Sequence, residues 1–66
     1  MNKVINKNGR EIDFEASVMY MNDEIRERLH AELAPCTEQE FFSAYEMAHE
    51  EATGEEWFLS GENPCY

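Results

Sequence analysis

Residues 37–58, "TEQEFFSAYEMAHEEATGEEWF", contain the clearest local signal of structure in the sequence. Thr37 is followed three residues later by Glu40, which is the capping-box pattern found at the start of a helix. At about 100° per residue, one helical face collects Phe41, Ala44, Tyr45, Ala48 and Ala52. Gly54 is placed to end the helix in the left-handed conformation. The stretch therefore predicts one amphipathic helix that begins after Thr37 and ends at Gly54.

The same stretch holds seven carboxylates and five aromatic rings but no lysine or arginine. Glu46 and Glu50 are four residues apart, as are Glu51 and Glu55, so each pair is predicted to share a helical face. Like charges at this spacing destabilise a helix by a few tenths of a kcal/mol. Because no base in the stretch compensates for them, we expect the carboxylates to serve binding. The alternative is that the acidity only keeps the protein soluble.

The segment before this helix, "KVINKNGREIDF" at residues 3–14, predicts a β-hairpin. Asn8-Gly9 is the dipeptide that a type I′ turn favours, since both central residues need positive φ. The apolar residues that flank the turn are Val4, Ile5, Ile12 and Phe14. A hairpin of two strands is marginally stable alone, so this one must pack against the helices.

Two further helical segments are expected between the hairpin and residue 37. Residues 14–21 have helical composition, and Asn22 is predicted to break or kink the chain before the next helix. That helix should run over residues 23–33, because Ile25, Leu29 and Leu33 recur at four-residue spacing. Pro35 is expected to end it, since the residue before a proline avoids the helical conformation.

The residues after Gly54 supply Trp57, Phe58 and Leu59. They are expected to form an aromatic arm that closes the core, or a short strand added to the hairpin. The predicted fold class is α+β, with an N-terminal β-hairpin packed on two or three α-helices. Residues 1–66 should form a single small acidic domain.

Charge and composition exclude several classes of function. A chain with 42% hydrophobic residues and eight aromatic rings is expected to fold. The net charge is −10, and residues 29–66 contain nine acids and no lysine or arginine. Direct binding to nucleic acid or to an anionic membrane is therefore not expected. No apolar run is long enough for a membrane span or a signal peptide, so the expected location is the host cytosol.

Metal binding and catalysis have little support in the sequence. The chemically suitable zinc ligands are His30, Cys36, His49 and Cys65, but their spacing matches no paired zinc motif. We expect free thiols and no metal or cofactor, while a small zinc-stabilised domain remains an alternative. Cys36 could act as a nucleophile with a histidine as base, yet no catalytic motif surrounds it. The protein is expected not to be an enzyme.

Three segments carry a resemblance to known proteins: "IDFEASVMYMNDEIRERL" at 12–29, "LAPCTEQEFFSAYEMAHEE" at 33–51 and "GEEWFLSGENP" at 54–64. The chain resembles short, acidic, uncharacterised proteins of phages and conjugative elements of gut Firmicutes. At the level of class it is similar to anti-CRISPR and anti-restriction proteins. Several of these proteins present carboxylates at the positions where their target binds DNA phosphates. This resemblance implies an anti-defence role and no particular functional residue.

We therefore expect a non-enzymatic inhibitor from a mobile element that mimics nucleic acid in the basic groove of a host nuclease or other nucleic-acid-binding protein. The residues predicted to contact this partner are Glu46, Glu50, Glu51, Glu55 and Glu56, with Phe42 and Trp57 as apolar anchors. Because so small a chain cannot bury every ring, some of the following should be exposed: Tyr20, Phe42, Trp57 and Tyr66. The alternative is a structural or regulatory module that forms a homodimer and whose acidity only solubilises it.

Overall fold

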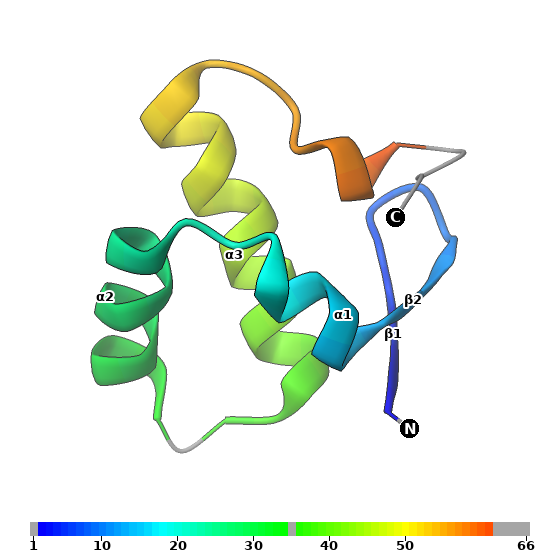
Figure 1. Cartoon of the computed structure of the whole chain (residues 1–66), viewed down its shortest axis with the longest axis horizontal. Helices are drawn as coiled ribbons and strands as arrows, with labels where there is room; N and C mark the ends of the chain where they lie inside the picture. Colours follow the sequence, from blue (N-terminus) through cyan, green and yellow to red (C-terminus); the bar gives the residue numbers. More distant parts are fainter. Residues whose placement is uncertain (1, 35, 62–66) are drawn as a thin grey trace.

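The computed structural model describes residues 2–34 and 36–61, which form the predicted α+β fold (Figure 1). An antiparallel hairpin comes first, three helices follow, and a short 3-10 turn ends the described chain. The elements are β1 (Lys3–Ile5), β2 (Glu11–Asp13), α1 (Phe14–Met19), α2 (Asp23–Leu33), α3 (Glu38–Thr53) and η1 (Phe58–Ser60). Both α2 and β1 contact α3, which is therefore the central element.

The hairpin has a different turn from the one that Asn8-Gly9 predicts. The Gly9 amide donates to the Asn6 carbonyl and the Asn6 amide donates to the Arg10 carbonyl, both at 2.9 Å. Gly9 has a φ of 81°, whereas no residue other than glycine has positive φ in the described chain. This is the pattern of a type I turn closed by a glycine bulge, so the predicted type I′ turn was wrong.

The longer turn sets the register of the two strands. Residues 7–9 form the loop, so Val4 lies opposite Ile12. A two-residue loop at Asn8-Gly9 would place Asp13 opposite Val4 instead. The observed register puts two apolar side chains together on the buried face of the hairpin, and both are almost completely inaccessible to water. Burial of this pair is the physical reason that the three-residue loop is preferred.

Each α-helix begins after a side chain that accepts a hydrogen bond from the backbone of its first turn. These caps are Asp13 for α1, Asn22 for α2 and Thr37 for α3, at N···O distances of 3.2, 3.2 and 3.1 Å. A cap satisfies an amide that has no partner within the helix. The predicted break at Asn22 and the predicted start of α3 are confirmed.

The ends of the helices also follow local signals. α2 ends at Leu33 as predicted, although Pro35 lies outside the described residues. α3 ends at Thr53, and Gly54 adopts the left-handed conformation with a φ of 76°. The Gly54 amide donates to the Glu50 carbonyl at 2.7 Å, which satisfies one of the last helical carbonyls. This prediction is confirmed as well.

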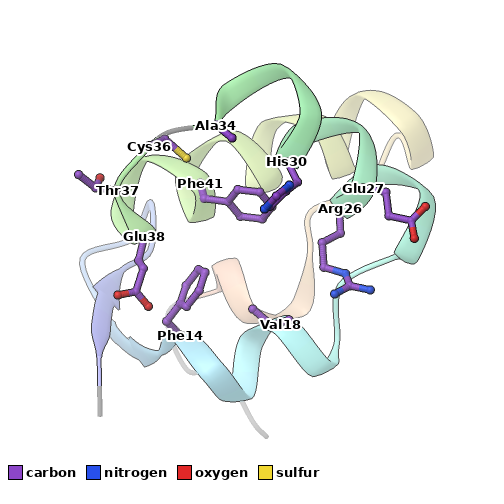
Figure 2. A pocket seen from close by; sticks show the side chains of 10 residues that line it. All are labelled: Phe14, Val18, Arg26, Glu27, His30, Ala34, Cys36, Thr37, Glu38 and Phe41. Atoms are coloured by element: carbon purple, nitrogen blue, oxygen red, sulfur yellow. The ribbon is translucent and has the colours of Figure 1, made fainter.

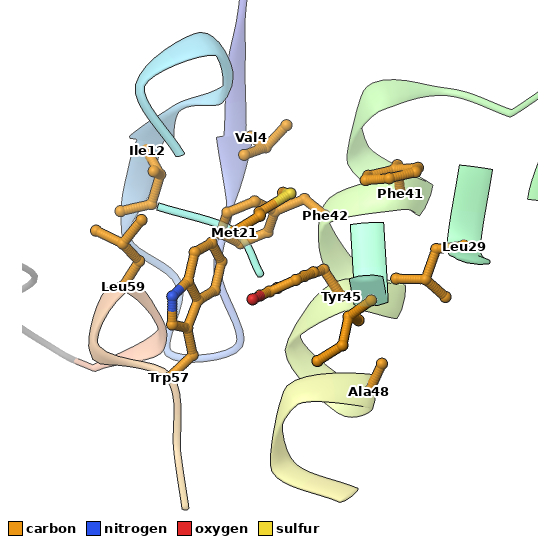
Figure 3. Close-up of a cluster of buried hydrophobic side chains, with 11 residues drawn as sticks. Val4, Ile12, Met21, Leu29, Phe41, Phe42, Tyr45, Ala48, Trp57 and Leu59 are labelled. Carbon is orange, nitrogen blue, oxygen red and sulfur yellow. The ribbon is translucent and has the colours of Figure 1, made fainter. Parts of the chain in front are cut away.

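The core brings together side chains from the hairpin, Met21, α2, α3 and the C-terminal arm, and side chains of α1 pack against it while partly buried (Figure 3). Its buried members are Val4, Ile12, Met21, Ile25, Leu29, Phe41, Phe42, Tyr45, Ala48, Trp57 and Leu59. Trp57 packs against two rings of α3, with centroid distances of 4.5 Å to Tyr45 and 5.5 Å to Phe42. The arm thus closes the core, which is one of the two arrangements that the sequence predicts.

The buried face of α3 is wider than its helical periodicity predicts. Phe41, Tyr45 and Ala48 are buried as predicted, but Phe42 and Glu46 are buried too. Ala52, which was assigned to the core face, is exposed. The difference arises because α2 covers one side of α3 while the hairpin and arm cover another, and Ala52 lies beyond both.

The arm is attached to the hairpin by the side chain of Asn6. Its amide nitrogen donates to the carbonyls of Leu59 at 2.8 Å and Gly61 at 2.9 Å. Its amide oxygen accepts from the backbone amides of Asn8 at 3.0 Å and Arg10 at 2.8 Å. This buried side chain therefore shapes the turn and fastens the arm at once. Within residues 55–61 the arm adds no strand to the sheet.

Candidate functional site

The structure divides the predicted partner-binding carboxylates into three groups, of which the first is buried. Glu46 is only 5% exposed. Its Oε2 accepts hydrogen bonds from the Ser60 hydroxyl at 2.6 Å and from the Lys7 backbone amide at 3.1 Å. Glu46 therefore links α3 to the arm and to the hairpin turn. Its carboxylate serves the fold and does not lie on the surface predicted for it.

The second group is paired with a lysine that lies far away in the sequence. The ammonium of Lys7 contacts the carboxylate of Glu50 and lies 3.0 Å from Oε2 of Glu56. The hydrogen bond that this ammonium donates to Glu50, followed by the one that it donates to Glu56, raises the pKa of Lys7 above its usual range. The acidic stretch thus has a compensating base after all, contributed by the hairpin turn. Local spacing could not reveal it.

Removal of this lysine should lower the stability of the protein by an amount that depends on pH. Because the pKa of Lys7 is raised in the folded state, its stabilising contribution is complete below the unfolded pKa of 10.5. The contribution disappears as pH rises through the higher folded pKa. Lys7→Met should therefore melt below the wild type at about pH 8, and the difference should shrink towards about pH 12. Melting curves across that range measure it, and the effect is small because the pair is exposed.

Lys3→Met is the matched control, since it removes the same charge from an exposed position with no ion pair among residues 2–34 and 36–61. Because Lys3→Met keeps the Lys7 ion pairs, its difference in melting temperature from the wild type should not shrink as Lys7 loses its proton. A constant difference between Lys7→Met and wild type at every pH would contradict the ion-pair assignment.

The third group consists of carboxylates that point to water. Glu51 and Glu55 are exposed, and no described lysine or arginine forms an ion pair with either. Since α3 ends at Thr53, Glu55 lies beyond the helix, and the predicted helical pairing with Glu51 is wrong. The loop that carries Glu55 is hydrogen-bonded to the end of the helix, because the backbone amide of Glu55 donates to the Thr53 hydroxyl at 3.2 Å. His49 Nδ1 lies 3.2 Å from the Glu55 carbonyl.

Around the C-terminal end of α3 these residues form an acidic surface, which we define as Glu50, Glu51, Glu55 and Glu56. Lys7 forms ion pairs with two of these four carboxylates, Glu50 and Glu56. Three sequence-predicted features meet here: the helix end, the glycine cap and the loop to the arm. The charge on this surface is therefore mostly uncompensated and is carried on a fixed backbone.

The two predicted apolar anchors lie in the core. Phe42 is fully buried and Trp57 is 3% exposed, so neither ring is available on the surface. Tyr20 is 48% exposed, which agrees with the expectation that some rings lie on the surface. Phe58, at 47% exposed, is a second surface ring. Tyr66 lies outside the described residues. The sequence shows Trp57 and Phe58 side by side, but only packing decides which of the two faces inward.

A groove of about 540 Å³ lies between α1, α2 and the start of α3 (Figure 2). Phe14 and Phe41 pack edge to face in it, with ring centroids 6.3 Å apart. His30 and Cys36 also line the groove, but no hydrogen bond joins them among the described contacts.

Within residues 2–34 and 36–61, no three potential metal ligands cluster. Cys36 is a free, exposed thiol, and Cys65 lies outside the described residues.

Comparison with protein families identifies the chain. The family model described as "Anti-CRISPR protein AcrIC5" matches residues 5–57, which include Lys7, all three α-helices and most of the acidic stretch. The chain belongs to the anti-CRISPR protein AcrIC5 family. No curated protein matches it. The class-level similarity to anti-CRISPR proteins is confirmed, and the anti-defence interpretation of the sequence with it.

Membership of the anti-CRISPR AcrIC5 family makes this protein an inhibitor that acts on host CRISPR-Cas proteins. Within the described part of the chain, no helix has both the length and the apolar character that crossing a bilayer requires. All four residues of the acidic surface lie inside the matched region.

Proposed function

We propose that this anti-CRISPR family member inhibits its target by placing the acidic surface in a basic, nucleic-acid-binding groove of a host CRISPR-Cas protein. In this proposal the target is a nuclease or another nucleic-acid-binding component. The exposed carboxylates take the positions of phosphates, so the inhibitor and the nucleic acid compete for one site. The protein needs no catalysis, no cofactor and no direct contact with nucleic acid, and it acts in the host cytosol.

The observation that carries the proposal is the unequal pairing of charge at the end of α3. Four carboxylates lie within seven positions, at 50, 51, 55 and 56, while Lys7 alone pairs with two of them. A surface selected only for folding would carry more basic partners, because like charges this close together destabilise the folded state. A basic groove would supply the missing counter-charges.

The backbone under these charges supports binding as well. The Gly54 cap and the Thr53 hydroxyl, which donates to the carbonyls of His49 and Glu55, hold the loop in one conformation. A fixed array of charges loses little conformational entropy when it binds. Mimicry of phosphates therefore does not require the loop to order on contact.

The proposal predicts that association depends on salt. An interference assay in cells carrying different CRISPR-Cas systems would first identify the inhibited system, and its purified effector then serves as the probe. A variant with Glu50, Glu51, Glu55 and Glu56 replaced by glutamine should associate at least about tenfold more slowly at low salt. Its rate should also vary less with ionic strength. Glu46 is left unchanged because its carboxylate is needed for folding.

The control replaces four exposed acids elsewhere, Glu11, Glu15, Glu27 and Glu32, by glutamine. Both variants lose the same formal charge, but the acidic-surface variant also loses the two ion pairs of Lys7, so its fold is checked separately. Stopped-flow or surface-based association rates, a DNA competition assay and a melting curve are measured for each. If the two variants associate equally fast, or if DNA does not compete with the wild type, nucleic-acid mimicry by the acidic surface is excluded.

A further inference from the structure

Two exposed aromatic rings form a pair on the surface. The rings of Tyr20 and Phe58 are perpendicular, at 88°, and their centroids are 5.3 Å apart. Tyr20 follows α1 directly, whereas Phe58 opens η1, so the pair joins segments that are distant in the sequence. About half of each side chain remains accessible to water. The fold thus brings two large rings together without burying them.

The backbone around each ring is hydrogen-bonded to neighbouring residues. The Tyr20 amide donates to the Ser17 carbonyl at 3.0 Å, and the Ser60 amide donates to the Trp57 carbonyl at 2.9 Å. Phe58 also packs against buried Trp57, with ring centroids 6.2 Å apart. Rings fixed in this way have little side-chain entropy left to lose on binding. Aromatic side chains of this kind are common energetic hot spots at protein interfaces.

Acidic residues flank the pair in both segments. Glu55 and Glu56 precede Trp57 and Phe58, while exposed Asp23 and Glu24 begin α2 three residues after Tyr20. A second copy of this chain would bring carboxylates against carboxylates around the rings, which electrostatic repulsion disfavours. A protein surface with an apolar depression inside a basic rim is complementary to both features.

We propose that Tyr20 and Phe58 are the apolar anchor of the inhibitor, and that they insert into an apolar depression beside the basic groove of the CRISPR-Cas partner. This inference rests on the proposed function and gives the anchor role, which the sequence assigned to Phe42 and Trp57, to two other rings. The acidic surface accelerates encounter, and the anchor slows dissociation. The two contributions differ in their response to salt, because burial of rings is not screened by ions.

The test uses the purified effector identified by the interference assay and the variant in which Tyr20 and Phe58 are both alanine. We expect its affinity to fall by about 30-fold or more, mainly through faster dissociation. The slope of log affinity against log salt should remain that of the wild type. The glutamine variant of the acidic surface should show the opposite pattern, with a changed slope and slower association.

Met47→Ala is the matched control, because Met47 is 66% exposed, more than either ring, and lies on α3 facing β1. It should bind like the wild type. Melting curves confirm that each variant is folded, and single substitutions replace the double one if it is not. If the ring variants dissociate as slowly as the wild type, or if Met47→Ala loses as much affinity as they do, the anchor proposal is wrong. Either result would leave the proposal of nucleic-acid mimicry unaffected. Dimerisation of the free wild type that the ring variants abolish would assign the pair to self-association and also overturn it.

Discussion

Replacing Trp57 by alanine is expected to lower the free energy of unfolding by about 3–5 kcal/mol. The indole is 3% exposed and packs against Phe42, Tyr45 and His49, so its removal leaves a cavity bordered by three rings. It also removes the ring contacts between the arm and α3, so that the hydrogen bond from Ser60 to Glu46 has to hold the two together. A domain of 66 residues has a small core, and a loss of this size is comparable to its whole stability. Urea unfolding followed by circular dichroism measures the change.

Phe58→Ala is the control for this substitution, because Phe58 is the neighbouring ring and is half exposed. Its free energy of unfolding should fall by about 1 kcal/mol or less. If Trp57→Ala were as stable as Phe58→Ala, the assignment of Trp57 to the core would be wrong. The comparison also decides how binding data are interpreted: lost inhibition in Trp57→Ala reports unfolding, whereas lost inhibition in folded Phe58→Ala reports a missing contact.

Asn6→Asp should destabilise the protein by about 3 kcal/mol or more, although it changes one amide nitrogen to an oxygen. An aspartate keeps the acceptor for the amides of Asn8 and Arg10. It loses both donors to the arm and turns a negative oxygen towards the carbonyls of Leu59 and Gly61. Because Asn6 is only 4% exposed, water cannot replace the lost partners. The arm should pack more loosely on the hairpin, to which the Asn8 side-chain amide still connects it through the Ser60 carbonyl. Hydrogen exchange at residues 57–61 should accelerate.

Asn22→Asp is the matched control, since it makes the same chemical change at the N-cap of α2. The Asn22 side chain uses its oxygen to accept from the Ile25 amide, and an aspartate can do the same. A negative charge at a helix N-terminus is favourable, so this variant should be as stable as the wild type or slightly more stable. Equal destabilisation of both variants would show that added charge, and not the attachment of the arm, determines the loss.

The difference between these two asparagines illustrates what could be predicted from sequence. Asn22, Thr37 and Gly54 act on backbone groups within about four residues, so their roles follow from spacing alone. For the same reason the three helices, the hairpin and the α+β class were predictable. The hairpin turn was only partly so, because Asn8-Gly9 suits two kinds of loop and burial of Val4 opposite Ile12 selected between them.

Residue type and spacing were enough to predict the helices, the caps at Asn22 and Thr37, the glycine that ends α3 and the excess of negative charge in residues 29–66. Which charges and rings reach the surface depends on how the segments pack together. Lys7 pairs with carboxylates 43 and 49 residues further along the chain, and Glu46 is buried and accepts a hydrogen bond from Ser60. Trp57 is buried, whereas its neighbour Phe58 is exposed. The physical reason is that burial and ion pairing depend on which segments meet in space. Neighbouring residues with the same chemistry can therefore have opposite roles.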